Sequence, residues 1–158
     1  MQNQQALALR GFFRVKLGEE RNGKQIVVAD SGWKKNEVTN LGFQNYVCAL
    51  IGATNGSKQV GMIIIGTGGA PATDATVLAG ETKRQTCGNA VVSSKTMRAT
   101  AAIASGDHPG GTPDIANIAL IENTASGGTI LCGNTFSSST WNSNQGLSAT
   151  YELRFATA

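Results

Sequence analysis

Residues 63–71 have the sequence Ile-Ile-Ile-Gly-Thr-Gly-Gly-Ala-Pro. Its isoleucines end an almost continuous apolar run that starts at Val60, and such a run predicts a strand that is covered on both faces. The glycines that follow predict tight backbone turns, and the proline stiffens the exit from the loop. These loop residues are Gly66, Gly68, Gly69 and Pro71. The stretch therefore predicts a buried strand and a shaped connection between strands.

The same loop does not match a nucleotide-binding loop. A phosphate-binding loop opens a helix whose N-terminal amides face the anion, and the P-loop type also supplies Gly-Lys-Ser/Thr. Here the glycines run into Pro71, and the first lysine after the strand is Lys83. We therefore expect no bound cofactor at this loop, and if the loop binds anything, we expect a protein surface.

The composition is typical of a single β-rich domain. A chain of 158 residues buries about two thirds of its unfolded surface. Charged residues make up 15% of the chain, which also has 20 glycines, as in proteins built from sheets and turns rather than long helices. We expect an N-terminal arm over residues 1–9 and a single β-sandwich domain over residues 10–158.

Alternating apolar residues predict strands near both ends of the chain. Phe13, Val15 and Leu17 alternate with basic residues, and Asn22-Gly23 supplies a tight turn before a return strand over residues 24–33. The same alternation continues from Leu147 to Phe155 near the C-terminus. Further strands are expected over residues 60–65, 82–93, 96–104, 115–122 and 129–137.

Short strands separated by turn signals predict an all-β, mainly antiparallel fold. We expect a β-sandwich or jelly-roll-like barrel of about eight strands. One short helix is expected near residues 40–51, with Asn40 as its N-cap and Gly52 as its stop. The apolar positions at helical spacing are Phe43, Val47, Leu50 and Ile51.

The charge pattern favours protein contacts over nucleic-acid binding. The net charge is +3, from 13 Lys and Arg residues against 10 Asp and Glu residues. The basic residues are spread along the chain, although the N-terminal half is the more basic, whereas nucleic-acid binders concentrate them in a stripe. Several outward strand faces carry Ser, Thr and Ala, which suits contact with another protein.

No group of residues typical of an enzyme or a metal site stands out. Cys48, Cys87 and Cys132 are widely spaced among small or apolar residues, which predicts reduced core cysteines. His108 is the single histidine, and a solvated turn is the simpler interpretation of Asp107-His108 in its Gly-Pro loop. We therefore expect no catalytic, cofactor-binding or metal-binding residues, and we expect that the protein is not an enzyme.

The two tryptophans leave two interpretations open. Tryptophan is enriched in cores and at interfaces, so Trp33 and Trp141 are expected as packing or interface anchors. A pair of tryptophans is also suited to stacking on a sugar. A receptor- or glycan-binding module is therefore an alternative function.

Several stretches of the chain have sequences that are similar to those of one protein family. Residues 30–43, Asp-Ser-Gly-Trp-Lys-Lys-Asn-Glu-Val-Thr-Asn-Leu-Gly-Phe, are similar to a signature that precedes a short helix. Residues 65–74, with the Leu78, Gly80-Glu81 and Arg84 that follow, are similar to a glycine-rich loop. Residues 118–122, 127–131, 135–136 and 151–155 are similar to closing strands. Together these stretches resemble the small structural proteins of tailed bacteriophage particles.

The resemblance implies a structural role in the virion, for a protein made in the host cytoplasm. Within that family we expect a capsid decoration (cement) protein that binds the major capsid protein on the outside of the head, as a homo-oligomer with a trimer favoured. A tail, baseplate or fibre-attachment component, with tail proteins as partners, is the alternative. We expect no small-molecule substrate, no direct nucleic-acid contact and no membrane contact. The residues expected at the interface are Trp33, Lys34, Lys35, Trp141, Gly66, Gly68, Gly69 and Pro71.

Overall fold

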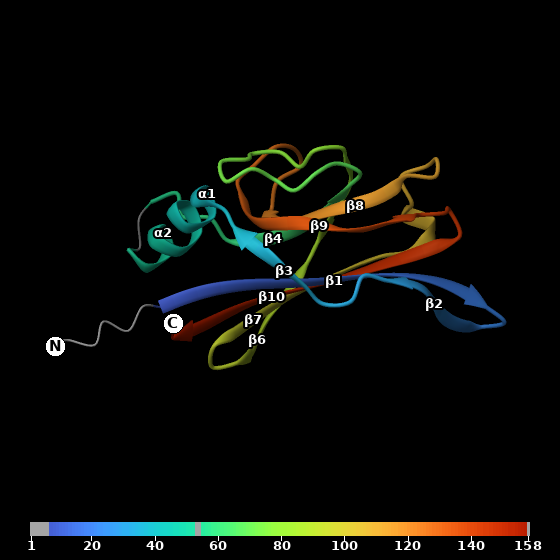
Figure 1. Ribbon diagram of the computed structural model, residues 1–158, viewed down its shortest axis with the longest axis horizontal. Helices are drawn as coiled ribbons and strands as arrows, with labels where there is room; N and C mark the ends of the chain where they lie inside the picture. The colour runs from blue at the N-terminus through green and yellow to red at the C-terminus, as the bar shows by residue number, and fades with distance from the viewer. Residues whose placement is uncertain (1–6, 53–54, 158) are drawn as a thin grey trace.

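The computed structural model describes residues 7–52 and 55–157 and shows two layers of antiparallel strands (Figure 1). The strands are β1 (Leu7–Arg21), β2 (Lys24–Asp30), β3 (Lys34–Val38), β4 (Val60–Gly66), β5 (Glu81–Thr86), β6 (Gly88–Ser93), β7 (Thr96–Ile103), β8 (Asp114–Glu122), β9 (Ile130–Thr140) and β10 (Gln145–Thr157). The predicted all-β, antiparallel class is confirmed.

The two layers share one strand. Sheet A contains β2, β1, β10, β7 and β6, and sheet B contains β5, β4, β8 and β9. On one side β1 pairs with β10, and on the other it pairs first with β3 and then with β2. β3 leaves β1 after Asn36 and pairs with β9 through Glu37 and Val38. It therefore joins the sheets into one nearly closed, barrel-like sheet.

On the side of the barrel opposite β3, the chain crosses from one sheet to the other at Cys87. The predicted single strand over residues 82–93 is wrong, because the chain changes sheets here: β5 lies at the edge of sheet B and β6 at the edge of sheet A. The Cys87 amide donates to the carbonyl oxygen of Gly61 (3.0 Å), and the Asn89 side chain donates to that of Val60 (2.8 Å). These bonds fasten the crossing segment to the start of β4.

Two apolar cores lie on the two faces of sheet B. Ile63 and Ile65 belong to the inner core between the sheets, whereas Ile64 packs in the outer core with Leu78. Leu78 comes from the loop over residues 67–80, which covers the outer face of sheet B (Figure 1). The prediction that β4 is covered on both faces is therefore confirmed, and each isoleucine that is fully buried contributes about 1.5–3 kcal/mol. The largest side chains of the inner core are Trp141, Tyr151 and Phe13.

The hairpin β1–β2 and the last strand follow the predicted alternation. Asn22 and Gly23 have φ angles of 53° and 71°, the left-handed pair that a two-residue hairpin turn requires. Alternate residues of β10 are buried as far as Leu153, but Phe155 lies beyond the core and lines an open groove.

Part of the expected N-terminal arm belongs to the sheet. β1 begins at Leu7, and Leu7–Leu9 pair with residues 155–157 of β10. These three residues are therefore not available to extend a partner's sheet through that edge. The remainder of the expected arm, residues 1–6, lies outside the described residues.

The helix spans residues 40–51 as expected, but its N-cap and its middle differ from the prediction. A π-helical segment, η1 (Phe43–Cys48), separates α1 (Asn40–Gly42) from α2 (Ala49–Ile51). The N-cap is Thr39 and not Asn40, because the Thr39 hydroxyl oxygen accepts a hydrogen bond from the Gly42 amide (2.8 Å). Gly52 ends the helix as predicted.

The wider π-helical turns change which side chains are buried. Tyr46 packs in the inner core, whereas the expected apolar positions Phe43, Leu50 and Ile51 are exposed. The predicted apolar face is therefore wrong, since it assumes a regular α-helical repeat. Within the described residues, no helix is long and apolar enough to cross a membrane.

Two of the three cysteines lie in the core, as predicted. Burial raises the pKa of the Cys87 thiol and raises that of Cys132 to about 12. Cys48 is exposed on η1, so the prediction of a core position is wrong for this residue. All three thiols are free.

Candidate interaction surface

The outer face of sheet A, which is turned away from sheet B, is open to solvent (Figure 1). Alternation along β1 buries Phe13 and Val15 in the core, and so it places Arg14 and Lys16 on this outer face. The pairing of β10 with β7 sets Thr150 beside Thr100 and Ser148 beside Ala102 on the same face. The middle of the face is therefore a floor of small side chains.

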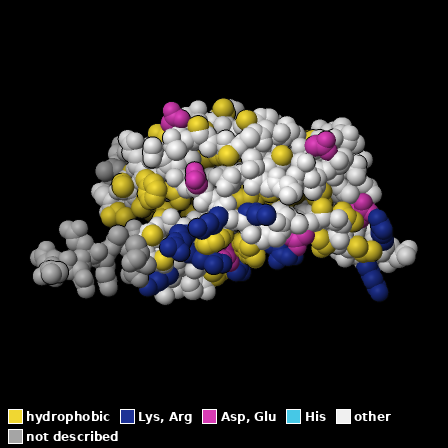
Figure 2. Space-filling model, in the orientation of Figure 1, with side chains coloured by type: hydrophobic (Ala, Val, Ile, Leu, Met, Phe, Trp, Pro, Cys, Tyr) yellow, Lys and Arg dark blue, Asp and Glu magenta, His cyan; other side chains and the backbone are white. Residues whose placement is uncertain are grey.

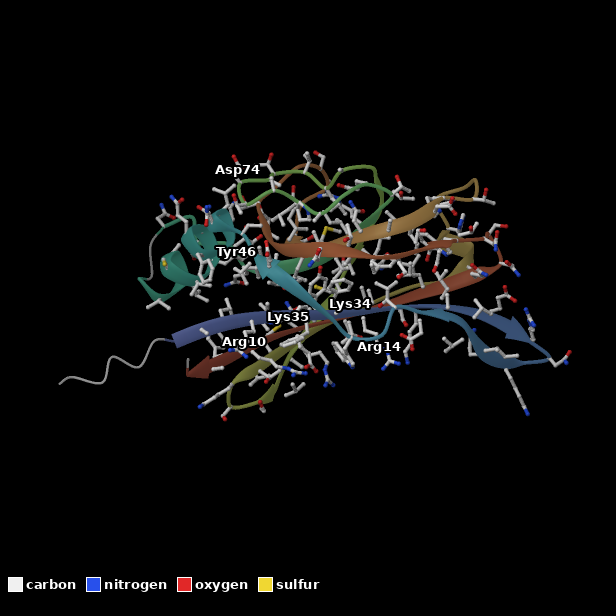
Figure 3. The ribbon with its side chains drawn as sticks, viewed as in Figure 1. Arg10, Arg14, Lys34, Lys35, Tyr46 and Asp74 are labelled. Carbon is white, nitrogen blue, oxygen red and sulfur yellow. The ribbon has the colours of Figure 1, made fainter. Side chains whose placement is uncertain are left out.

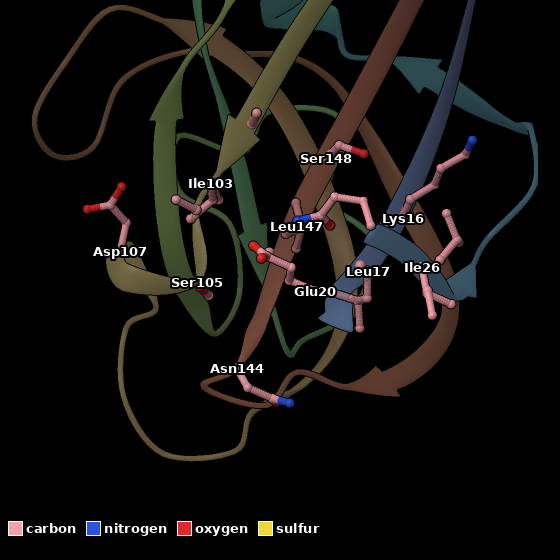
Figure 4. Close-up of a pocket in the computed structure, with 16 residues that line it drawn as sticks. Lys16, Leu17, Glu20, Ile26, Ile103, Ser105, Asp107, Asn144, Leu147 and Ser148 are labelled. Carbon is pink, nitrogen blue, oxygen red and sulfur yellow. The ribbon is translucent and has the colours of Figure 1, made fainter. Parts of the chain in front are cut away.

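This face is hollowed into a continuous trough. A groove of about 630 Å³ lies between the β1–β2 hairpin and the ends of β7 and β10, with Lys16 and Ile26 on one side and Asp107 on the other (Figure 4). A second hollow of about 290 Å³ is lined by Trp33 and Arg98. Because Lys16 and Ser148 line both hollows, we treat them as one surface, the sheet A trough.

Basic side chains gather on this side of the molecule (Figure 2). β1 carries Arg10 and Arg14, and the neighbouring β3 carries Lys34 and Lys35 (Figure 3). Seven of the 13 Lys and Arg residues of the chain lie on the outer face of sheet A or on the adjoining β3 strand. They are Arg10, Arg14, Lys16, Lys34, Lys35, Arg98 and Arg154.

One buried carboxylate holds two of these arginines. Glu152 is 4% exposed, and its two oxygens accept hydrogen bonds from Arg98 (2.6 Å) and Arg154. Burial alone would raise the pKa of Glu152, but the hydrogen bonds from the two guanidinium groups outweigh it, and the pKa is lowered. The Arg154 guanidinium also lies 4.4 Å from the centre of the Phe12 ring, which is cation–π geometry.

A second carboxylate fixes the wall of the trough. Asp30 accepts two hydrogen bonds from Arg14, and this pairing lowers the pKa of Asp30 to about 2. Asp30 also accepts from the Gly32 amide (2.9 Å), at a glycine with a φ of 64°. Ser31 exchanges two hydrogen bonds with the Val15 backbone. The turn that presents Trp33 is therefore tied to β1.

The structure places the residues expected at an interface in three separate locations. Trp33 lies just before β3, Lys34 and Lys35 are the first two residues of β3, and Trp33 is 43% exposed. Trp141 is fully buried and donates its indole N–H to the Gln145 carbonyl oxygen (2.9 Å), so it offers no surface to a partner. The expectation for Trp141 is corrected to a core role.

The glycine-rich loop lies over the outer face of sheet B. A Cβ at Gly66 would lie 2.7 Å from the Gly80 carbonyl oxygen, and one at Gly68 would lie 2.5 Å from that of Ala79. Glycine is therefore required where the two ends of the loop meet. A Cβ at Gly69 would meet nothing within 4 Å, and the Pro71 ring packs over Gly133.

One buried side chain anchors this loop to the sheet. Asn117 on β8 donates from its amide nitrogen to the carbonyl oxygens of Gly69 (2.8 Å) and Ala79 (2.9 Å). The loop is thus a cover for the outer core as well as a connection between strands.

A second open surface lies at the helix end of the molecule. A groove of about 360 Å³ separates the helix from the ends of β1 and β10, and its lining is mainly apolar. Ile51, beside it, is 79% exposed. The helix is held in place by Tyr46, whose hydroxyl donates to Glu122 (2.7 Å), and Glu122 also pairs with Lys58.

The described residues contain no group of three or more His, Cys, Asp or Glu side chains that could hold a metal ion. His108 uses both ring nitrogens: Nδ1 accepts from the Gly110 amide, so Nε2 carries the proton and donates to the Trp141 carbonyl oxygen (3.0 Å). In this arrangement His108 supports the loop beside Trp141.

The sequence did not single out Asp30, Arg98, Glu152 or Arg154 as parts of one surface. Its alternation places the last three on outward strand faces, but only the register of β10 against β1 and β7 brings them together. Comparison with known proteins adds no assignment, because no family model, no curated protein and no solved structure matches this chain.

Proposed function

We propose that this protein is a non-enzymatic structural component of a tailed phage particle, and that it binds the outer surface of the head as a decoration protein. The partner in this proposal is the major capsid protein. The sequence resemblance is the reason for proposing a phage particle. The open surfaces of the protein support a docking role.

The sheet A trough is the observation that carries the proposal. A floor of Thr100, Thr150 and Ser148 allows close approach of another backbone, and polar side chains of this size lose little conformational entropy when they are covered. The basic and aromatic side chains on the walls of the trough would orient the partner and make the contact specific. These are properties of a protein-binding face.

A cement protein must hold more than one neighbour, and the molecule has two open surfaces. The sheet A trough and the apolar groove beside the helix are lined by different residues, with no lining residue in common. Two modest contacts on separate capsid subunits combine through their high effective concentration. Such a protein stabilises a shell even though each contact is weak.

Counting copies in purified particles tests the proposal. We expect quantitative mass spectrometry to find the chain at a constant ratio to the major capsid protein, and heat release of the genome to occur at a lower temperature in particles stripped of the chain. A handful of copies per particle would instead support a tail, baseplate or fibre-attachment position.

We also propose that the protein is a homo-oligomer, with a trimer as the expected form. Light scattering on the purified protein checks this, because a trimer has three times the chain mass of 16.3 kDa. A monomer at the concentrations found in the cell would contradict it.

The structure does not favour the glycan-binding alternative. A two-tryptophan platform needs both rings at the surface, and the Trp141 ring is fully buried.

A further inference from the structure

We propose that the outer face of sheet A, made up of the sheet A trough and the neighbouring Arg10 and Lys35, docks onto an acidic patch of the partner protein, with Trp33 as an apolar anchor. This proposal rests on the proposed function and adds the chemistry of the partner surface.

Three cations on this side of the molecule form no salt bridge within the described residues. We call them the free cations: Arg10, Lys34 and Lys35. Lys16 is not one of them, because it pairs in register with Asp30 and interacts electrostatically with that carboxylate. Glu37, also on β3, makes no ion pair in that part of the chain either, and it does not neutralise them at contact distance. A partner carboxylate therefore has cations available without breaking an existing pair.

Two arginines stand directly opposite each other at one end of this face. Arg10 on β1 pairs in register with Arg154 on β10, and like charges at such positions oppose strand pairing. Arg154 is drawn toward Glu152, whereas Arg10 is exposed. A carboxylate placed between the two guanidinium groups would convert this repulsion into attraction.

The paired arginines are already oriented for binding. Arg14, Arg98 and Arg154 each donate through Nε and Nη2 to Asp30 or Glu152. Nη1 of each has no hydrogen bond within the described part of the chain, so it remains for a second acceptor. Holding the side chain in advance reduces the entropy lost on binding.

The trough fits a protein better than a nucleic-acid backbone. Trp33 and the exposed Val27 give it apolar walls, which a folded partner can match with side chains of its own. Glu20 and Asp107 also line its wider end (Figure 4), and they would repel a uniformly charged phosphate chain. An acidic patch that includes apolar groups complements both features.

Binding to DNA-free capsid shells stripped of this protein tests the proposal. The variant Arg10→Ser/Lys35→Ser removes two charges from the docking side, and the control Lys24→Ser/Lys83→Ser removes two from the hairpin tip and sheet B. We expect the dissociation constant to rise about tenfold for the first and less than about twofold for the control, with the difference shrinking as salt is added. Trp33→Ser should weaken binding at all salt concentrations.

The outcomes separate this proposal from the proposed function. Wild-type affinity in Arg10→Ser/Lys35→Ser would overturn docking of an acidic patch on this outer face and leave the capsid role standing. Binding to free DNA that is tighter than binding to the shells, and that Arg10→Ser/Lys35→Ser weakens, would assign this face to nucleic acid and overturn the proposal. If the wild-type chain binds no shells, the capsid role fails, and poly-L-glutamate serves as the probe: binding that Arg10→Ser/Lys35→Ser weakens would support an acidic partner, and no binding would overturn it.

Discussion

The two sheets carry the same kind of strands but differ in what covers them. Sheet B lies between two apolar cores, one shared with sheet A and one closed by the loop over residues 67–80. Sheet A is covered on its inner face alone, and its outer face is the trough. The strand sequences reflect this difference: Ile63-Ile64-Ile65 is apolar throughout, whereas β1 alternates from Phe13 to Leu17.

The difference teaches where stability and binding reside in this protein. Residues covered on both sides of sheet B contribute to the free energy of unfolding, because removing them leaves cavities. Exposed residues on the outer face of sheet A are free to change with little loss of stability, which leaves them available for recognition. The following substitutions challenge that division, from the largest expected effect to the smallest.

Shortening Ile64 should cost the most stability. Ile64→Ala removes a fully buried side chain from the outer core, and we expect the free energy of unfolding to fall by about 2–5 kcal/mol. Urea denaturation measures it. Val27→Ala on the exposed side of β2 is the control, with an expected change within about 0.5 kcal/mol. Equal losses for the two variants would contradict the division between the sheets.

Adding a methyl group to the covering loop should cost less. In Gly68→Ala the new Cβ would lie 2.5 Å from the Ala79 carbonyl oxygen, so the loop must shift away from sheet B. We expect a loss of about 1–3 kcal/mol in urea denaturation. Gly69→Ala is a close control, because nothing lies within 4 Å of the added Cβ. A loop that tolerates both changes equally would not be a tight cover.

Neutralising Glu152 should have a moderate effect on sheet A. Glu152→Gln leaves Arg98 and Arg154 without their shared carboxylate, and we expect a loss of about 1 kcal/mol at neutral pH. The pKa of Glu152 is lowered in the folded protein, so its contribution is present above the unfolded pKa and disappears as the pH falls. Urea denaturation at pH 7 and in acid should therefore show the variant and the wild type converging in acid.

The Asp30–Arg14 pair should give the smallest effect, and one that depends on pH. The folded pKa of Asp30 is about 2, below the ordinary value of 3.8. The pair therefore stabilises the protein above that ordinary value, and the stabilisation is lost as the pH falls toward 2. An NMR titration of the Asp30 carboxyl carbon measures the pKa directly. A midpoint near 3.8 would show that the pair does not form in solution.

Much of the fold follows from local patterns in the sequence. Asn22-Gly23 specifies its hairpin because both residues tolerate positive φ, and the alternation of Leu147, Ala149 and Tyr151 specifies which face of β10 is buried. These features depend on neighbouring residues alone. They are therefore accessible without knowledge of the tertiary structure.

The missed features depend on contacts between distant residues. β3 is short and carries Lys34 and Lys35, so nothing local marks it as the strand that joins the sheets. The change of sheet at Cys87 depends on its bond to Gly61. The π-helical turn in η1 lies where the helix places Tyr46 against Glu122, a contact that spans 76 residues.

The candidate surface also combines features that local sequence predicts with features that depend on distant contacts. The sequence places Trp33, Lys34 and Lys35 at a surface, and they lie together beside the trough. It could not join them to Arg98, because that requires the order β1, β10, β7 in sheet A. Burial of Trp141 likewise follows from the closing of the loops around it, beside His108.

The unequal burial of the three cysteines provides a single labelling position at the helix end of the protein. A thiol reagent at neutral pH should modify Cys48 alone, since burial shields Cys87 and Cys132 and raises their pKa values. Cys48 sits on the helix whose Val47 and Leu50 line the apolar groove. A fluorophore attached there would sense whether that groove becomes covered in an assembled particle, without any engineered residue.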